Sequence, residues 1–255
     1  MREISKLVAL AGGIAFAATL AHAADQTILG KSLTVKDPTA GVDPAKRSIK
    51  GSAKEKGSGN PLVGDPTLAG SAGGALLDIF ANGTNSTAQE FPLPQGISST
   101  GKPFWSASGN TGFKYKDNKG EQGPVKSVVV KKSANGAFSI KVKLSGKNGT
   151  INVVPPNPGT SGCLALKLGT SASAGDRYSV AFGPESKIKN VDAKVFSAKK
   201  PTNEGICPLV VVTTTTTTVA TSSSTTSTHA STTTTTTLYG SPSRAFLEKV
   251  EGLLD

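Results

Sequence analysis

One strictly alternating segment constrains the fold of this chain most. In Phe138–Leu144, apolar residues take every second position, with serine and lysine between them. A period of two is typical of a β-strand that buries one face. The valine-rich segment Val125–Lys132 precedes it, and Asn135-Gly136 lies between them, a strong signal for a tight hairpin. The pattern therefore predicts two adjacent antiparallel strands.

Similar segments occur on both sides of this hairpin. A second Asn-Gly, at 148–149, predicts a turn into a strand over Thr150–Val154. One further strand each is expected in 27–35, 48–53, 75–80, 164–168, 178–182 and 188–199. No helical period of useful length separates them, which disfavours parallel βαβ units. We expect an all-β fold, an antiparallel sandwich or jelly-roll-like domain over residues 24–208.

The N-terminus has the three parts of a secretory leader. Arg2 and Lys6 supply positive charge, Leu7–Leu20 is an uncharged and largely apolar run, and Ala21-His22-Ala23 forms an A-x-A cleavage site. We expect residues 1–23 to be a signal peptide and the protein to be exported: secreted, on the cell surface or periplasmic. No later stretch of 18 apolar residues occurs, so no transmembrane helix is expected.

Export changes how the cysteines are interpreted. Cys163 and Cys207 are the only two, and a lone pair in an oxidising compartment predicts a disulfide. Two free thiols are the alternative.

The C-terminal part has a different composition. Residues 209–240 are rich in Thr and Ser, and such a segment buries too little apolar surface to fold. We expect a disordered linker, either O-glycosylated as a stalk or unmodified. Residues 241–255 follow, with Ser241 as a helix N-cap and Pro242 at the first helical position. They predict a short amphipathic helix that docks on a partner or on its own domain, or else frays.

Histidine is missing from the predicted domain. His22 lies in the leader and His229 in the Thr-rich tract. This excludes Ser-His-Asp and Cys-His nucleophiles and histidine-based metal sites there. Neither cysteine belongs to a C-x-x-C pair. We expect no enzyme, no cofactor and no metal site. Paired carboxylates are catalytic groups that the domain could still use. Such a site would have two of them facing each other about 5–10 Å apart in a cleft.

Large aromatic residues gather in one region. Phe104, Trp105 and Tyr115 belong to this group, and Trp105 is the only tryptophan. Two interpretations fit. Exposed, the rings would form a stacking platform for a sugar; buried, they would belong to the core.

Lysine dominates the charge of the chain, which is formally +11. Two groups stand out: Lys126, Lys131, Lys132, Lys141, Lys143 and Lys147, and then Lys187, Lys189, Lys194, Lys199 and Lys200. They could be solvated faces that prevent strand edges from aggregating, or they could attract an acidic cell surface or polyanionic glycan. Arginine is scarce and export is expected, so base readout of nucleic acid is not expected.

Several short motifs together resemble a known type of domain. They are Lys36-Asp37-Pro38, Asp43–Arg47, Gly112–Asp117, Gly123–Lys126, and Cys207-Pro208 ahead of a low-complexity tail. This set resembles an exported, β-rich domain of uncharacterised bacterial proteins. The resemblance covers most of residues 27–208, implies no activity and excludes the C-terminal helix.

These patterns favour an exported, non-enzymatic surface or extracellular protein with a structural or binding role. Cell-envelope or extracellular polysaccharide is the partner that this interpretation implies. A carbohydrate-binding module with the platform Phe104, Trp105 and Tyr115 is the first alternative. A carboxylate-dependent, glycan-active enzyme is the second.

Overall fold

The computed structural model describes residues 24–171, 174–215 and 233–238. The predicted leader, residues 1–23, and the predicted C-terminal helix, residues 241–255, lie outside these ranges. In the described part of the chain the regular elements are strands and short 3₁₀ turns, which confirms the all-β prediction. None of the helical turns in those ranges is long and apolar enough to cross a lipid bilayer.

Two sheets make up the domain. The five-stranded sheet has the order β1 (Asp25–Thr27), β11 (Arg177–Phe182), β10 (Gly159–Leu168), β4 (Ala75–Gly83) and β5 (Thr87–Leu93). The eight-stranded sheet has the order β12 (Lys187–Val191), β13 (Val195–Lys199), β2 (Gly30–Lys36), β3 (Ser48–Glu55), β9 (Phe138–Ser145), β8 (Val125–Lys132), β7 (Gly112–Lys116) and β6 (Trp105–Ala107). The 3₁₀ turns are η1 (Pro44–Lys46), η2 (Gly70–Ala72), η3 (Gly109–Thr111) and η4 (Gly146–Asn148). The described pairs are antiparallel except β1–β11, which is parallel.

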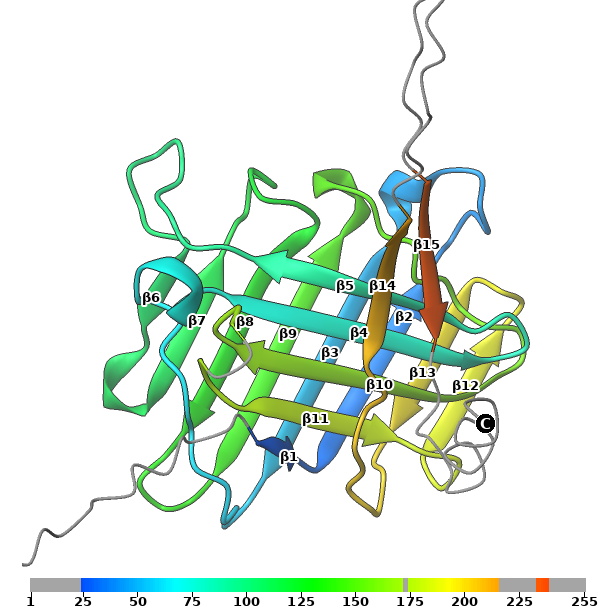
Figure 1. Ribbon diagram of the computed structural model, residues 1–255. Coiled ribbons are helices and arrows are strands. Elements are labelled where there is room, and N and C mark those ends of the chain that lie inside the picture. The colour runs from blue at the N-terminus through cyan, green and yellow to red at the C-terminus, as the bar shows by residue number, and fades with distance from the viewer. Residues whose placement is uncertain (1–23, 172–173, 216–232, 239–255) are drawn as a thin grey trace, which may run out of the picture.

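The sheets lie face to face, and the strands of one cross those of the other steeply (Figure 1). Their inner faces share one apolar core. Phe138 of β9 and Tyr178 of β11 meet there with ring centroids 5.0 Å apart. At Gly51 a Cβ would lie only 2.7 Å from the Leu164 side chain of the opposite sheet. Glycine at this position therefore lets the two layers approach closely.

The central hairpin agrees with the sequence prediction. Strands β8 and β9 pair antiparallel, with Val130 opposite Ile140. Gly136 lies in the turn with φ +80°, in the left-handed region that favours glycine. Val130 and Ile140 are both fully buried. The alternation had therefore identified the core face correctly.

Thr150–Val154 does not form the predicted strand. Ile151 and Val153 are buried as the pattern suggests, but the backbone joins no ladder. Side chains of β5 form hydrogen bonds with the backbone of this segment instead. The Thr87 hydroxyl bonds both N and O of Val154, and the Gln89 amide bonds Thr150 O and Asn152 N. These side chains stand between the two backbones and cover the edge of the five-stranded sheet.

Residues 188–199 form two strands rather than the single one predicted. The chain reverses at Asp192 and Ala193, which have φ +37° and +54°, and Lys194 N donates to Val191 O. Three residues, 192–194, connect the paired Val191 and Val195, and positive φ at the first two makes the reversal tight. Neither residue is a glycine, so composition did not indicate the turn. Strands β5, β6 and β7 were also not predicted.

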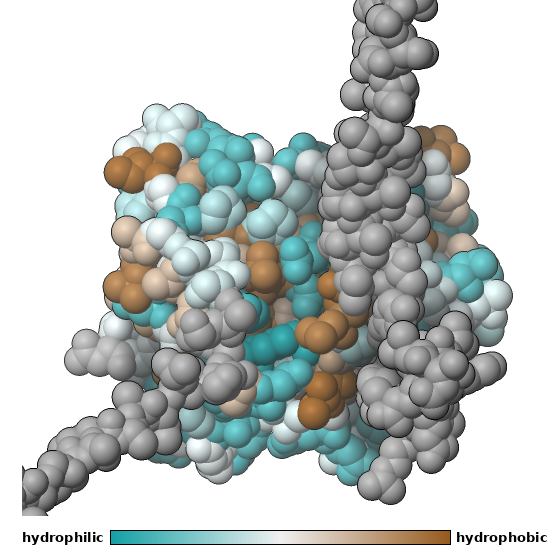
Figure 2. Space-filling view, viewed as in Figure 1, coloured by the Kyte–Doolittle hydropathy of each residue, from teal (hydrophilic) through white to brown (hydrophobic). Residues whose placement is uncertain are grey.

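The outer face of the five-stranded sheet carries the segment around Cys207. Cys163 and Cys207 are disulfide-bonded, as predicted. Beside the disulfide, the buried Arg177 guanidinium forms ion pairs with Asp25 at 2.9 Å and Asp78 at 3.3 Å. It also donates to the carbonyl oxygens of Cys207 and Pro208. Figure 2 shows hydrophilic and hydrophobic residues side by side on this face.

The Thr-rich segment is described at its two ends only. Val210–Thr215 (β14) pairs antiparallel with Thr233–Leu238 (β15). This hairpin crosses in front of the five-stranded sheet and lies against β5 (Figure 1). The ends of the predicted linker are therefore paired strands, and the disorder of the rest stays a prediction.

We predict that the disulfide stabilises the domain by about 4 kcal/mol, because it closes a loop with a sequence separation of 44. Urea unfolding with and without a reductant measures this difference. A Cys163→Ser/Cys207→Ser variant is the control and should be insensitive to the reductant. Equal stability of the oxidised and reduced wild type would contradict the prediction.

Candidate anion-binding face

The outer face of the eight-stranded sheet is formed largely by lysine, serine and threonine. Strand alternation turns the apolar residues inward and these side chains outward. We call this surface the lysine face. Its lysines are Lys36, Lys50, Lys54, Lys114, Lys116, Lys131, Lys141, Lys143, Lys187, Lys189 and Lys199.

Strand register arranges these side chains in rows across the sheet. One row runs Lys199, Ser32, Ser52, Lys141, Val129, Lys114 and Ser106. The next runs Lys189, Ser197, Thr34, Lys50, Lys143, Ser127 and Lys116. Hydroxyl groups bond across strands within the rows, at 2.8 Å between Ser32 and Ser52. Lysines from strands far apart in the sequence thus form one surface.

Like charges are direct neighbours in these rows. Lys50 lies opposite Lys143, and Lys187 lies opposite Lys199. Like charges directly across an antiparallel pair destabilise a sheet. The arrangement is therefore not one that stability alone would select, and an anion bound between the lysines would relieve the repulsion.

Carboxylates do not neutralise the lysine face. No aspartate or glutamate occupies an outward position of the described strands of this sheet. Within the described ranges, the only lysine in an ion pair is Lys46, which lies in η1 and not on this face. The other ion-paired carboxylates are Asp37 with Arg47, and Asp25 and Asp78 with Arg177. The ammonium groups of the lysine face are consequently free to bind a partner.

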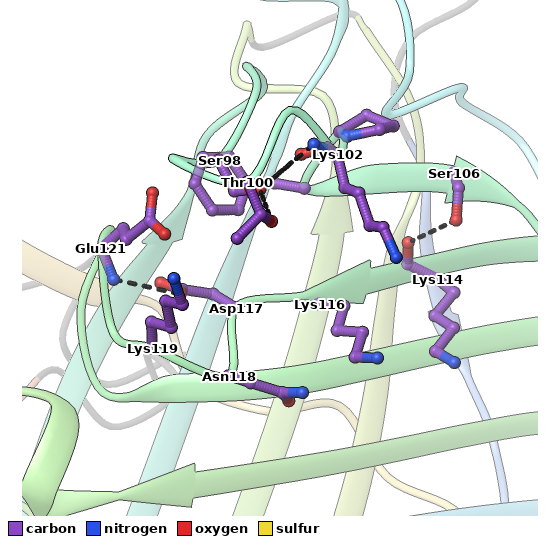
Figure 3. A pocket seen from close by; sticks show the side chains of 12 residues that line it. Ser98, Thr100, Lys102, Ser106, Lys114, Lys116, Asp117, Asn118, Lys119 and Glu121 are labelled. Atoms are coloured by element: carbon purple, nitrogen blue, oxygen red, sulfur yellow. Dashed lines mark hydrogen bonds between the residues drawn. The ribbon is translucent and has the colours of Figure 1, made fainter.

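A groove of about 400 Å³ lies at the β6–β7 end of the lysine face. Lys114 and Lys116 project into it from β7, and Lys102 and Lys119 reach it from loops (Figure 3). Ser98, Thr100 and Ser106 add hydroxyl groups. We call this hollow the β6–β7 groove.

The two carboxylates at the groove are already engaged. Asp117 is buried and accepts hydrogen bonds from the backbone N–H groups of Gly120, Glu121 and Gln122. Glu121 accepts from the hydroxyl and the backbone N–H of Ser99, and these bonds lower the pKa of Glu121. Both carboxylates therefore hold loops in place and leave the lysines of the groove unpaired.

The predicted aromatic platform is not exposed. Phe104, Trp105 and Tyr115 are 2%, 4% and 1% exposed and belong to the core, which agrees with the second interpretation of the sequence. Trp105 Nε1 donates to the Leu93 carbonyl at 3.0 Å, and its ring lies 5.3 Å from that of Tyr115. Burial raises the pKa of Tyr115 well above its ordinary value. The rings support the hairpin that presents Lys114 and Lys116.

Two carboxylates face each other elsewhere, on the outer face of the five-stranded sheet. Asp78 and Glu90 are cross-strand partners. Burial raises the pKa of Asp78 to about 6 against the opposing effect of Arg177, and burial also raises the pKa of Glu90. Because Asp78 is held by Arg177, this pair belongs to the contact that fixes the Cys207 segment. Among the described residues, no group of three or more His, Cys, Asp or Glu is placed to hold a metal ion.

Comparison with known proteins adds no relative. No protein-family model, curated protein or solved structure matches the chain. The resemblance to exported β-rich domains therefore stays a prediction from the sequence. The lysine face was visible in the sequence only as lysines alternating with apolar residues in separate strands.

We predict that Trp105→Phe lowers the free energy of unfolding by about 1–3 kcal/mol, because the Leu93 carbonyl loses its buried donor. Urea unfolding measures the change. A variant that keeps its stability but loses affinity for a neutral oligosaccharide would restore the platform interpretation.

We also predict a pH dependence from Asp78. Its pKa lies above the ordinary 3.8, so the folded state binds this proton more tightly than the unfolded state. The stabilisation by protonated Asp78 is therefore complete below about pH 4, and it is lost as the pH rises through about 6. Unfolding free energies measured from pH 4 to 7 should fall less steeply in Asp78→Asn than in wild type. Identical slopes would contradict this assignment.

Proposed function

We propose that this is an exported, non-enzymatic protein that binds an acidic polysaccharide of the cell envelope or extracellular matrix on its lysine face. One observation carries the proposal: rows of exposed lysines cross the eight-stranded sheet without a carboxylate among the outward positions of its described strands. Two features support export. The sequence predicts a leader, and the disulfide is a bond typical of oxidising compartments.

The chemistry of the face suits a long, repeating anion. Each exposed ammonium group contributes little alone, because water and salt screen it. Several contacts to one polymer act together, since each later contact forms within a complex that already exists. From β13 to β7 the rows extend over about 24 Å, taking about 4.8 Å between neighbouring strands. Serine and threonine hydroxyls between the lysines can bond sugar hydroxyls.

The alternatives have less support. A platform for neutral sugars needs an exposed ring face, and the rings of Phe104, Trp105 and Tyr115 are buried. A glycan-active enzyme needs two free carboxylates, whereas Asp78 is bound by Arg177. Lysine without arginine suits general attraction to an anion better than the bidentate recognition of bases.

We predict that the protein binds polygalacturonate, a carboxylated polysaccharide, and does not bind dextran, a neutral one. Because screening weakens exposed charges, the dissociation constant should rise about tenfold between roughly 50 and 300 mM salt. Isothermal titration at several salt concentrations measures both effects. No binding to polygalacturonate at low salt, or equal binding to dextran, would refute the proposal.

Two charge-reversal variants, each with three substitutions, test where the polysaccharide binds. Lys50→Glu/Lys141→Glu/Lys143→Glu changes neighbouring positions of the lysine face and should weaken binding at least about tenfold. Lys56→Glu/Lys147→Glu/Lys194→Glu makes the same change of net charge at exposed lysines in turns and loops, and should weaken it far less. Equal losses would mean that net charge, not the lysine face, governs binding. Tighter binding to double-stranded DNA than to polygalacturonate would point to a different class of partner.

A further inference from the structure

Asp176 is a buried carboxylate beside the point where the predicted leader would be removed. It directly precedes β11 and is 5% exposed. Its Oδ1 accepts a hydrogen bond from the backbone nitrogen of Ala24 at 2.9 Å, and its Oδ2 accepts one from the Gln26 side chain. Within the described ranges it has no ion-pair partner.

The other buried aspartates have a cationic partner or more donors. Asp37 pairs with Arg47 at 3.0 Å, and Asp78 pairs with Arg177 at 3.3 Å. Asp117 accepts three backbone N–H groups from its own turn. A buried carboxylate is costly unless a cation or several donors compensate it. Asp176 is thus the buried aspartate whose surroundings, as described, lack a cation or such a cluster of donors.

The nitrogen that faces Asp176 is held firmly. Arg177 N donates to the carbonyl of Ala24 at 2.9 Å, and the parallel pairing of β1 with β11 continues from there. Ala24 itself is exposed, while the carboxylate that it meets is buried. In the sequence, Ala21-His22-Ala23 predicts cleavage directly before this residue.

We propose that cleavage between Ala23 and Ala24 completes this site, and that the new α-ammonium group of Ala24 is the cationic partner of Asp176. The step is a hydrolysis by a leader endopeptidase of the exporting cell. Water adds across the Ala23–Ala24 peptide bond, Ala23 leaves as a carboxylate, and the freed amine of Ala24 takes up a proton. A hydrogen bond from an uncharged backbone N–H to the Asp176 carboxylate becomes a contact between opposite charges, because the donor is then an ammonium group.

The consequence reaches beyond the N-terminus. Strand β1 has only three residues and lies at the edge of the five-stranded sheet, so its pairing alone holds it weakly. It supplies Asp25 to Arg177, which in turn holds the Cys207 segment. Removal of the leader therefore tightens the contact that joins both ends of the domain. This inference does not depend on the ligand proposed for the lysine face.

The test compares two chains that run to Asp255. One begins at Ala24, released from a fusion by a protease that leaves no extra residue, and the other carries Gly-Ser before Ala24. We expect the extension to lower the melting temperature by about 3–8 °C, because it moves the ammonium group away from Asp176. In Asp176→Asn the same extension should change it by no more than about 1 °C. Asp192→Asn, which removes an exposed charge in a turn, is the matched control and should respond as wild type does.

Two results would overturn the inference: no effect of the extension in wild type, or an equal effect in Asp176→Asn. If Asp176→Asn does not fold, the α-amine of the wild-type chain that begins at Ala24 is labelled with isotopic methyl groups and titrated by NMR. With Asp176 as its partner, and with Asp25 and Arg177 as the other charged groups nearby, its pKa should lie above the ordinary value of about 8. An unchanged value would refute the pairing, and so would an exported protein whose intact mass shows a first residue other than Ala24.

Discussion

The packing of two sheets through a single apolar layer is the constraint on which the other features of this protein depend. Leu33, Ile49, Val130, Ile140 and Leu164 are almost fully buried between the layers. Because side chains alternate along a strand, filling that layer leaves every other position outside. In the eight-stranded sheet those positions hold mainly lysine, serine and threonine. The apolar core and the lysine face are therefore two sides of one sequence pattern.

The hydrogen bonds of Arg177 hold the two ends of the domain, strand β1 and the Cys207 segment, to the five-stranded sheet. Its guanidinium group bonds Asp25 of β1, Asp78 of β4 and the carbonyls of Cys207 and Pro208. A buried arginine is tolerated when its donors find carboxylates and carbonyls in this way. The disulfide beside it fixes the same segment covalently. Two independent bonds thus hold the chain where it leaves the domain.

Local patterns predicted the structure well where the hydrogen-bond partner is near in sequence. The β8–β9 hairpin follows from alternation and Asn135-Gly136, and the disulfide follows from a single pair of cysteines. The predictions failed where contacts with distant residues determine the backbone conformation. Ile151 and Val153 show the alternation of a strand, yet side chains of β5 take the backbone bonds of their segment. The turn at Asp192 and Ala193 needs positive φ without glycine, so nothing in its composition marked it.

The sequence by itself determined that this chain forms strands, which faces of those strands are apolar, that its cysteines can only pair with each other, and that its N-terminus has the pattern of a leader. Each of these depends on spacing over a few residues or on simple counting. Only the tertiary structure placed lysines from β2, β3, β7, β8, β9, β12 and β13 on one surface, buried the aromatic rings and set Ala24 against Asp176. Those contacts join distant segments: Ala24 and Asp176 are 152 residues apart, and Thr34 and Ser197, which bond within the lysine face, are 163 apart. They depend on strand order and register, and no local pattern encodes these because a strand of this kind can pair with any other that offers a matching face.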